Sequence, residues 1–121
     1  MSFNKNDSII YKKAFDFSLD IFKIYEFLKN QKEYDLARQI LKSSTSIAAN
    51  IREGLEGQRK KDFIAKFSIA LKEAAETEYW LEFLIATDVL SAKKISGLSN
   101  DLSEIIKILN SILNTSKNTE R

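Results

Sequence analysis

Apolar residues recur at intervals of three and four positions along most of the chain, as they do on one face of an α-helix. The pattern predicts four helices, over residues 8–29, 35–53, 62–87 and 91–114, followed by a frayed polar tail at 115–121. Four helices of similar length, joined by short polar loops, favour antiparallel neighbours. We therefore predict an all-α protein whose 121 residues form one domain, an antiparallel up-down-up-down four-helix bundle.

Two of the predicted helices carry more apolar surface than one core needs. Beside its core stripe, the first helix has a second stripe that is aromatic, and the third helix has an apolar stripe interrupted by acids. Partial burial by supercoiling of the bundle is one interpretation of this surplus. Contact between copies is the other, because exposed apolar patches mark contact surfaces. We expect an oligomer interface formed by Tyr11, Phe15, Phe22 and Tyr25 of the first helix and Ile69, Trp80 and Phe83 of the third.

Helix ends and glycines give local expectations. Gly54 and Gly57 are expected to end the second helix in left-handed conformations, which glycine adopts without strain. Asp62 and Ser91 are residue types that cap the start of a helix, and they precede the third and fourth apolar stripes. Gly97 lies within the fourth helix, where we expect it to allow a close approach of a neighbouring helix.

The composition excludes most catalytic chemistry. The chain has no cysteine and no histidine, which removes the thiol nucleophile, the commonest general base and the commonest metal ligands. Glu78 falls within the core arc of the third helix, where we expect a hydrogen-bonded structural role rather than acid–base catalysis. No catalytic residue, metal, cofactor or small-molecule substrate is therefore expected, and we predict that the protein is not an enzyme.

Charge is distributed unevenly, although the net charge is only +2. Residues 1–61 hold 12 Lys or Arg and 8 Asp or Glu, whereas residues 62–121 hold 7 and 9. The basic excess predicts a strip that could bind phosphate groups, formed by Arg38, Lys42, Arg52, Arg59, Lys60 and Lys61. The alternative is that these side chains are simply solvated.

A motif at the end of the second helix carries a family resemblance. Residues 46–54 read SIAANIREG, with Gln39 before them and Asp62-Phe63, Ile69-Ala70, Glu76 and Leu81 after them. This series resembles the four-helix-bundle family of 23S rRNA intervening-sequence proteins. The motif positions, which we interpret as a polar seam and its terminator, are Gln39, Ser46, Asn50, Glu53, Gly54 and Glu76.

The resemblance implies an antiparallel four-helix bundle that assembles into a ring-shaped homopentamer. Members of the family are encoded within intervening sequences of ribosomal RNA genes or stand alone in bacterial genomes. A related group, the accessory proteins of diversity-generating retroelements, uses such a pentamer to bind nucleic acid and a reverse transcriptase. This chain is similar in its motif but nearly neutral in charge, which predicts weaker nucleic-acid binding.

Two functional hypotheses follow. The first is a homo-oligomer, most simply a pentamer, that binds RNA or a ribonucleoprotein weakly through the basic strip. The second is a protein-interaction scaffold, or an accessory subunit of an enzyme such as a reverse transcriptase, that does not itself bind nucleic acid. The chain has no apolar run long enough to cross a membrane and no signal-peptide pattern in its first ten residues, so we expect a cytoplasmic protein without a membrane partner.

Overall fold

The computed structural model describes residues 5–118, with side chains from Ile9 onward. It consists of four α-helices joined by three short loops: α1 (Lys5–Asn30), α2 (Tyr34–Leu55), α3 (Lys60–Ala86) and α4 (Ala92–Asn118). Residues 5–118 contain no strand. The predicted all-α four-helix fold is therefore confirmed, and α4 extends beyond its predicted end to Asn118.

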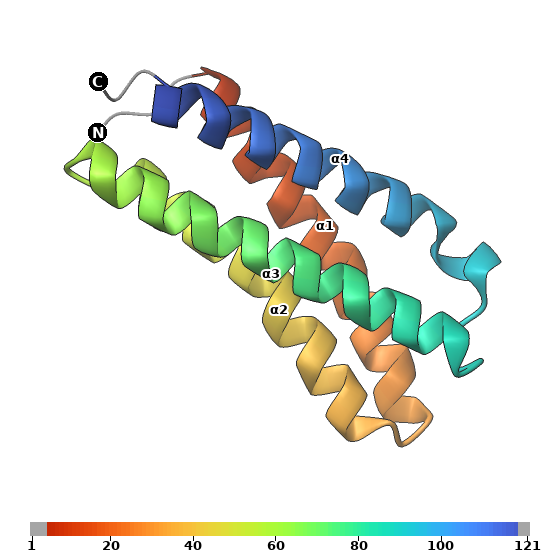
Figure 1. Cartoon of the computed structure of the whole chain (residues 1–121). Helices are drawn as coiled ribbons and strands as arrows, with labels where there is room; N and C mark the ends of the chain where they lie inside the picture. The colour runs from red at the N-terminus through yellow and green to blue at the C-terminus, as the bar shows by residue number, and fades with distance from the viewer. Residues whose placement is uncertain (1–4, 119–121) are drawn as a thin grey trace.

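Each helix packs against its neighbours in sequence, and α1 also packs against α4, whereas the diagonal pairs make no close backbone contact. Figure 1 shows two helical hairpins that cross at an angle, with the start of α1 beside the end of α4. The α1–α2 loop and the α3–α4 loop are separated at the opposite end (Figure 1). Over the described residues, no helix combines the length and the apolar character that crossing a bilayer requires.

The core consists of the four predicted apolar stripes. In α1 all six predicted core positions are buried: Ile10, Ala14, Phe17, Ile21, Ile24 and Leu28. The main stripes of α2, α3 and α4 are buried as well, with Ile40, Ile47, Ile51, Phe67, Ala70, Leu84, Leu102 and Leu109 among their most enclosed members. Burial of these faces is the main stabilising contribution, at about 25 cal/mol for each Å² of apolar surface.

The expectation for the glycines at the end of α2 is wrong. The helix ends at Leu55, and no glycine among the described residues has a positive φ. Gly54 instead lies inside α2 and faces α3, where an added Cβ would stand 2.7 Å from Cδ1 of Phe67. The missing side chain of Gly54 therefore allows α2 and α3 to approach closely.

Gly97 and Asp62 also differ from expectation. Gly97 is exposed, and a Cβ at this position would meet nothing within 4 Å, so no helix approaches it closely. Asp62 does not cap α3, because the helix begins two residues earlier, at Lys60, and Asp62 accepts hydrogen bonds from the Arg59 side chain instead. By contrast Ser91 caps α4 as predicted, since its Oγ accepts the Lys94 N–H at 3.2 Å.

Candidate functional site

The aromatic stripe of α1 lies on the side of the helix that faces α2. Tyr11 fixes this orientation, because its hydroxyl lies beside Arg52 of α2 and raises the pKa of that guanidinium, with Glu56 contributing further. Phe15 and Phe22 are exposed, and their rings lie 6.0 Å from Tyr11 and 5.6 Å from Tyr25, respectively, between centroids. Both tyrosines are half-buried. We call this stripe the α1/α2 face.

A second apolar surface lies on α3. Ile69 and Phe83 are exposed and Trp80 is half-buried, with its ring centroid 6.0 Å from that of Phe83. Tyr79 completes an aromatic cluster, with its ring 5.1 Å from Trp80 and 6.2 Å from Phe83. We call the surface formed by Ile69, Tyr79, Trp80 and Phe83 the α3 face.

The sequence interpretation missed two residues of these surfaces. Leu19 is 52% exposed, one turn after Phe15, and Tyr79 is 54% exposed. Both lie on the side of their helix opposite the core. Their spacing from Phe15 and Phe83, which is four residues in each case, is the signal that could have identified them.

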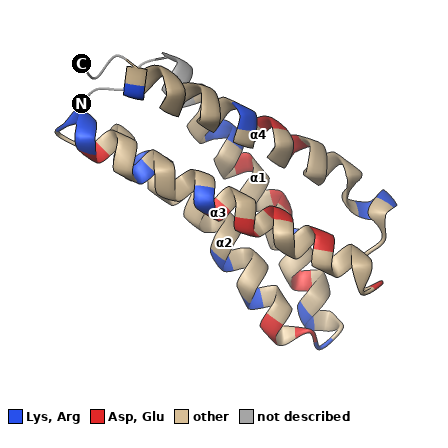
Figure 2. Ribbon diagram, in the orientation of Figure 1, with Lys and Arg blue, Asp and Glu red and all other residues tan. Residues whose placement is uncertain are grey.

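The six residues of the basic strip lie on the surface of α2, in the α2–α3 loop and in the first turn of α3. Three of the six cations are paired with acids of their own segment. Arg38 pairs with Asp35, Arg52 Nε lies 3.6 Å from Glu56, and Arg59 pairs with Asp62 at 3.1 Å. Figure 2 shows the resulting mixture of blue and red along α2 and at the start of α3.

The Arg59–Asp62 pair joins the loop to α3. Asp62 accepts hydrogen bonds from Arg59 Nε at 3.2 Å and from Arg59 Nη2 at 3.1 Å. These bonds hold the pKa of Asp62 below its ordinary value of 3.8 and raise the pKa of Arg59. Asp62 is therefore ionised at neutral pH and opposes the charge that Arg59 would present to a phosphate.

Among the family-motif residues, Glu53 and Gly54 of α2 contact α3, whereas Asn50 and Glu76 bond within their own helices. Asn50 Nδ2 donates to the Ser46 carbonyl at 2.8 Å, and Glu53 forms an ion pair with Lys66 of α3 at 2.9 Å. Glu76 lies one turn before Trp80 and accepts the indole N–H at 3.5 Å. The sixth position, Gln39, is exposed on α2. Of these polar contacts, only the Glu53–Lys66 ion pair joins α2 to α3.

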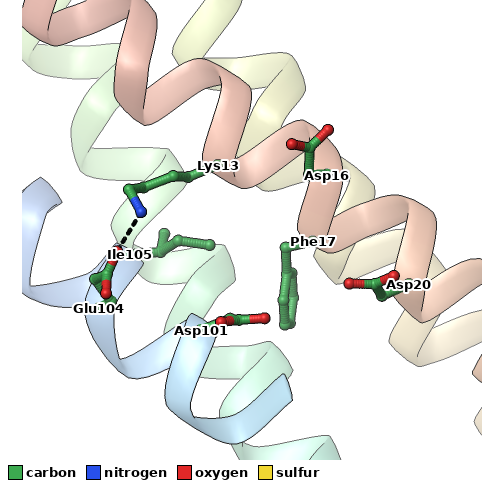
Figure 3. Close-up of a pocket in the computed structure, with 7 residues that line it drawn as sticks. All are labelled: Lys13, Asp16, Phe17, Asp20, Asp101, Glu104 and Ile105. Carbon is green, nitrogen blue, oxygen red and sulfur yellow. Dashed lines mark hydrogen bonds and ion pairs between the residues drawn. The ribbon is translucent and has the colours of Figure 1, made fainter. Parts of the chain in front are cut away.

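A pocket of about 160 Å³ lies between α1 and α4. Figure 3 shows Phe17 and Ile105 at the pocket, with charged side chains from both helices around them. Lys13 of α1 forms an ion pair with Glu104 of α4, which raises the pKa of Lys13. Three further carboxylates, Asp16, Asp20 and Asp101, complete the lining. Among the described residues, no group of three or more carboxylates is arranged to hold a metal ion.

The expectation for Glu78 is wrong. This side chain is exposed and lies on the α4 side of α3, beside Glu82 and Ser99, rather than in the core against the polar residues of α2. Residue 78 lies about 60° from the centre of the core stripe when successive residues advance by roughly 100°, so it stands at the margin where α4 leaves the side chain open to solvent.

The chain is thus an all-α four-helix bundle with two exposed aromatic faces and a surface strip of cations. The chain belongs to the 23S rRNA-intervening sequence protein family, whose model matches residues 6–111. It is similar to a crystal structure of a protein of unknown function from the S23 ribosomal protein family of Bacteroides thetaiotaomicron VPI-5482. The two chains are 44% identical with a TM-score of 0.86, over 90% of this chain and 98% of that one. A search of curated proteins gave no match.

Proposed function

We propose that the protein is a non-enzymatic, self-associating bundle, a ring-like homopentamer, that binds RNA or a ribonucleoprotein weakly through its basic strip. The observation that carries the proposal is the pair of exposed aromatic faces beside a strip of surface cations. The family supports a link to ribosomal RNA by its name alone.

Self-association is supported by the size and kind of the exposed side chains. Phe15, Leu19 and Phe22 on α1 and Tyr79 and Phe83 on α3 are large apolar residues that the bundle leaves uncovered. Grouped aromatic side chains of this kind are typical anchors of protein interfaces. Covering them with another copy would remove apolar surface from water without changing the core.

Weak RNA binding is supported by the charge balance of the strip. Because three of the six cations already have acidic partners, a phosphate must compete with a carboxylate at each of them. Lys42 and Lys61 are exposed and have no ion-pair partner among the described residues. Such contacts depend strongly on salt, because each releases a counterion from the nucleic acid.

The test is a filter-binding titration with a single-stranded RNA oligonucleotide at low and moderate salt. Lys60→Glu combined with Lys61→Glu should reduce affinity at least several-fold at low salt. The matched control reverses Lys107, an exposed lysine of α4, together with Lys93, an exposed lysine at the start of α4. An affinity that does not change with salt concentration would refute binding through the strip, and so would an equal loss of affinity in both double variants.

The charge pairing also favours a second function, a protein-interaction scaffold or an accessory subunit, for example of a reverse transcriptase. In that case the cations serve solubility, and the aromatic faces contact a partner protein. A partner that remains bound to the tagged protein after nuclease treatment and at high salt would support this function. The scaffold function would then replace RNA binding as the explanation of the basic strip.

A further inference from the structure

One face of α2 carries the helical part of the basic strip. Its members recur at intervals of three and four residues and are Arg38, Lys42, Thr45, Ala49 and Arg52. At roughly 100° per residue they lie within an arc of about 80°, and all of them are exposed. Because α2 packs against α1 on one side and α3 on the other, this arc lies away from the core. We call it the α2 outer face.

The cations of the α2 outer face stand at its two ends, with small side chains between them. Lys42 and Arg52 are ten residues apart, which is about 15 Å at the helical rise of about 1.5 Å per residue. Thr45 and Ala49 are the members between them, and neither is larger than a threonine. The middle of the face is therefore a shallow saddle that is bordered by positive charge.

We propose, on the basis of the RNA binding proposed above, that the RNA is double-stranded and that the α2 outer face lies across its minor groove. Phosphates on one edge of the groove then meet Arg38 and Lys42, and phosphates on the other edge meet Arg52. The cations of the α2–α3 loop extend the contact beyond Arg52. Since Arg38 and Arg52 are paired with Asp35 and Glu56, phosphates must replace these carboxylates, which keeps the binding weak.

The shape of the α2 outer face suits this groove better than the grooves of B-form DNA. The minor groove of an RNA duplex is wide and shallow, so a flat surface can cover it. The minor groove of B-DNA is only about 6 Å wide, which is narrower than the gap between Lys42 and Arg52. Its major groove is about 8.5 Å deep and admits a protruding helix, whereas α2 is flanked by α1 and α3.

The same face offers little to a single strand. Proteins that bind single-stranded nucleic acid stack its bases on aromatic side chains, and no member of the α2 outer face is aromatic. Phe15 and Phe22, the exposed rings of the neighbouring α1/α2 face, serve contacts between copies in the proposed assembly. A single strand would therefore contribute only its phosphates, and these are not held at a fixed spacing as they are across the groove of a duplex.

Thr45 provides a contact that distinguishes RNA from DNA. Its Oγ1 donates to the Leu41 carbonyl at 2.8 Å, so toward a ligand this oxygen acts as an acceptor. The ribose 2′-hydroxyl, which is displayed in the minor groove of an RNA duplex and is absent from DNA, can donate to it. This contact favours an RNA duplex over a DNA duplex of the same sequence.

The experiment is a filter-binding titration of the full chain at low salt with three nucleic acids of one sequence. These are an RNA duplex of about 16 base pairs, which spans two successive minor grooves, the corresponding DNA duplex, and one RNA strand alone. The RNA duplex should bind several-fold more tightly than either of the others. Thr45→Val should weaken binding of the RNA duplex and leave the affinity for the DNA duplex unchanged.

A second variant tests the saddle itself. Ala49→Met raises the middle of the face without changing its charge, so the affinity for the RNA duplex should fall several-fold to that of the single strand. Ser111→Met, at an exposed small residue of α4, is the matched control and should bind as the wild type does. Circular dichroism and light scattering should show both variants folded and assembled like the wild type. If Ala49→Met loses helicity, Ala49→Gln provides the same test.

The outcomes separate this inference from the proposed function. If none of the three nucleic acids binds, the proposed function is refuted and this inference with it. If RNA binds but the duplex has no advantage over the single strand or over the DNA duplex, this inference alone is refuted. A preference for the RNA duplex that persists in Ala49→Met would also refute it, because the groove would then lie against another part of the surface.

Discussion

The hydroxyl groups of Thr77 and Ser43 lie 2.8 Å apart in the buried contact between α3 and α2. Both side chains are fully buried. Thr77 Oγ1 also lies 2.9 Å from the Glu73 carbonyl, and Ser43 Oγ lies 3.3 Å from the Ile40 carbonyl, so each hydroxyl has a backbone partner within its own helix. The direct contact is a buried polar link between α2 and α3.

Thr77→Val should therefore destabilise the bundle by about 1 kcal/mol, because it removes a buried hydrogen bond at nearly constant volume. A double-mutant cycle with Ser43→Ala measures the link itself through urea denaturation. The effects of the two changes should not add, since the second loses a bond already broken by the first. Additive losses would mean that each hydroxyl is held by its own helix and that the link between helices contributes nothing.

Gly54 offers a test of the close approach between α2 and α3. In Gly54→Ala the new Cβ would lie 2.7 Å from Cδ1 and 2.9 Å from Cε1 of Phe67, a fully buried ring, and 3.2 Å from Lys66 Cβ. Since the ring stands in a filled core, relief requires the helices to separate. We expect a loss of about 1–3 kcal/mol in the free energy of unfolding, as for other overpacked cores, measured by urea denaturation.

Gly97→Ala is the matched substitution and should have the opposite sign. Its Cβ would enter open space on the exposed side of α4, so only the change in helix propensity remains. Alanine is favoured over glycine within a helix by up to about 1 kcal/mol, and the variant should be more stable by that order. Destabilisation at residue 97, or a gain at residue 54, would contradict the packing described for these two glycines.

These two glycines illustrate what the sequence could and could not predict. The spacing of apolar residues predicted the four helices and the buried stripes, because the helical period places such residues on one side whatever the partner is. Gly54 and Gly97 have no side chain to contribute to that pattern. Whether a glycine allows contact, as at Gly54, or faces solvent, as at Gly97, depends on the helix opposite, and the sequence does not specify how that helix is positioned.

The candidate site, too, was predicted from the sequence only in part. The predicted aromatic stripes are on the surface, with Phe15 and Phe22 exposed and Tyr11 and Trp80 half-buried. The pairing of the strip's cations was not predicted, because an exposed arginine has several acids within reach of its flexible side chain. Arg59 with Asp62 is the clearest case, since we expected Asp62 to cap α3 rather than to accept from Arg59.

The Arg59–Asp62 pair predicts a pH dependence of stability at the acid end. The Arg59 hydrogen bond is the main cause of the lowered pKa of Asp62 in the folded state. The stability that the ionised Asp62 contributes is therefore fully present above the ordinary pKa of 3.8, and it is lost as pH falls through the lowered pKa. The free energies of unfolding of the wild type and of Asp62→Asn should therefore differ by a small, constant amount near neutral pH. The difference should shrink only below 3.8. A difference that disappears at higher pH would contradict the pairing.

Asp62→Asn should also strengthen RNA binding. The change removes the carboxylate that holds Arg59 at 3.1 Å and releases the guanidinium to a phosphate. For a single-stranded RNA, one added phosphate contact steepens the dependence of log affinity on log salt by about 0.7. Asp101→Asn on α4, also an exposed acid, makes the same change in net charge away from the strip. The general effect of the changed net charge is equal in the two variants. A larger rise in affinity at low salt in Asp62→Asn than in Asp101→Asn would therefore locate a bound phosphate at Arg59. Equal rises would contradict a contact there.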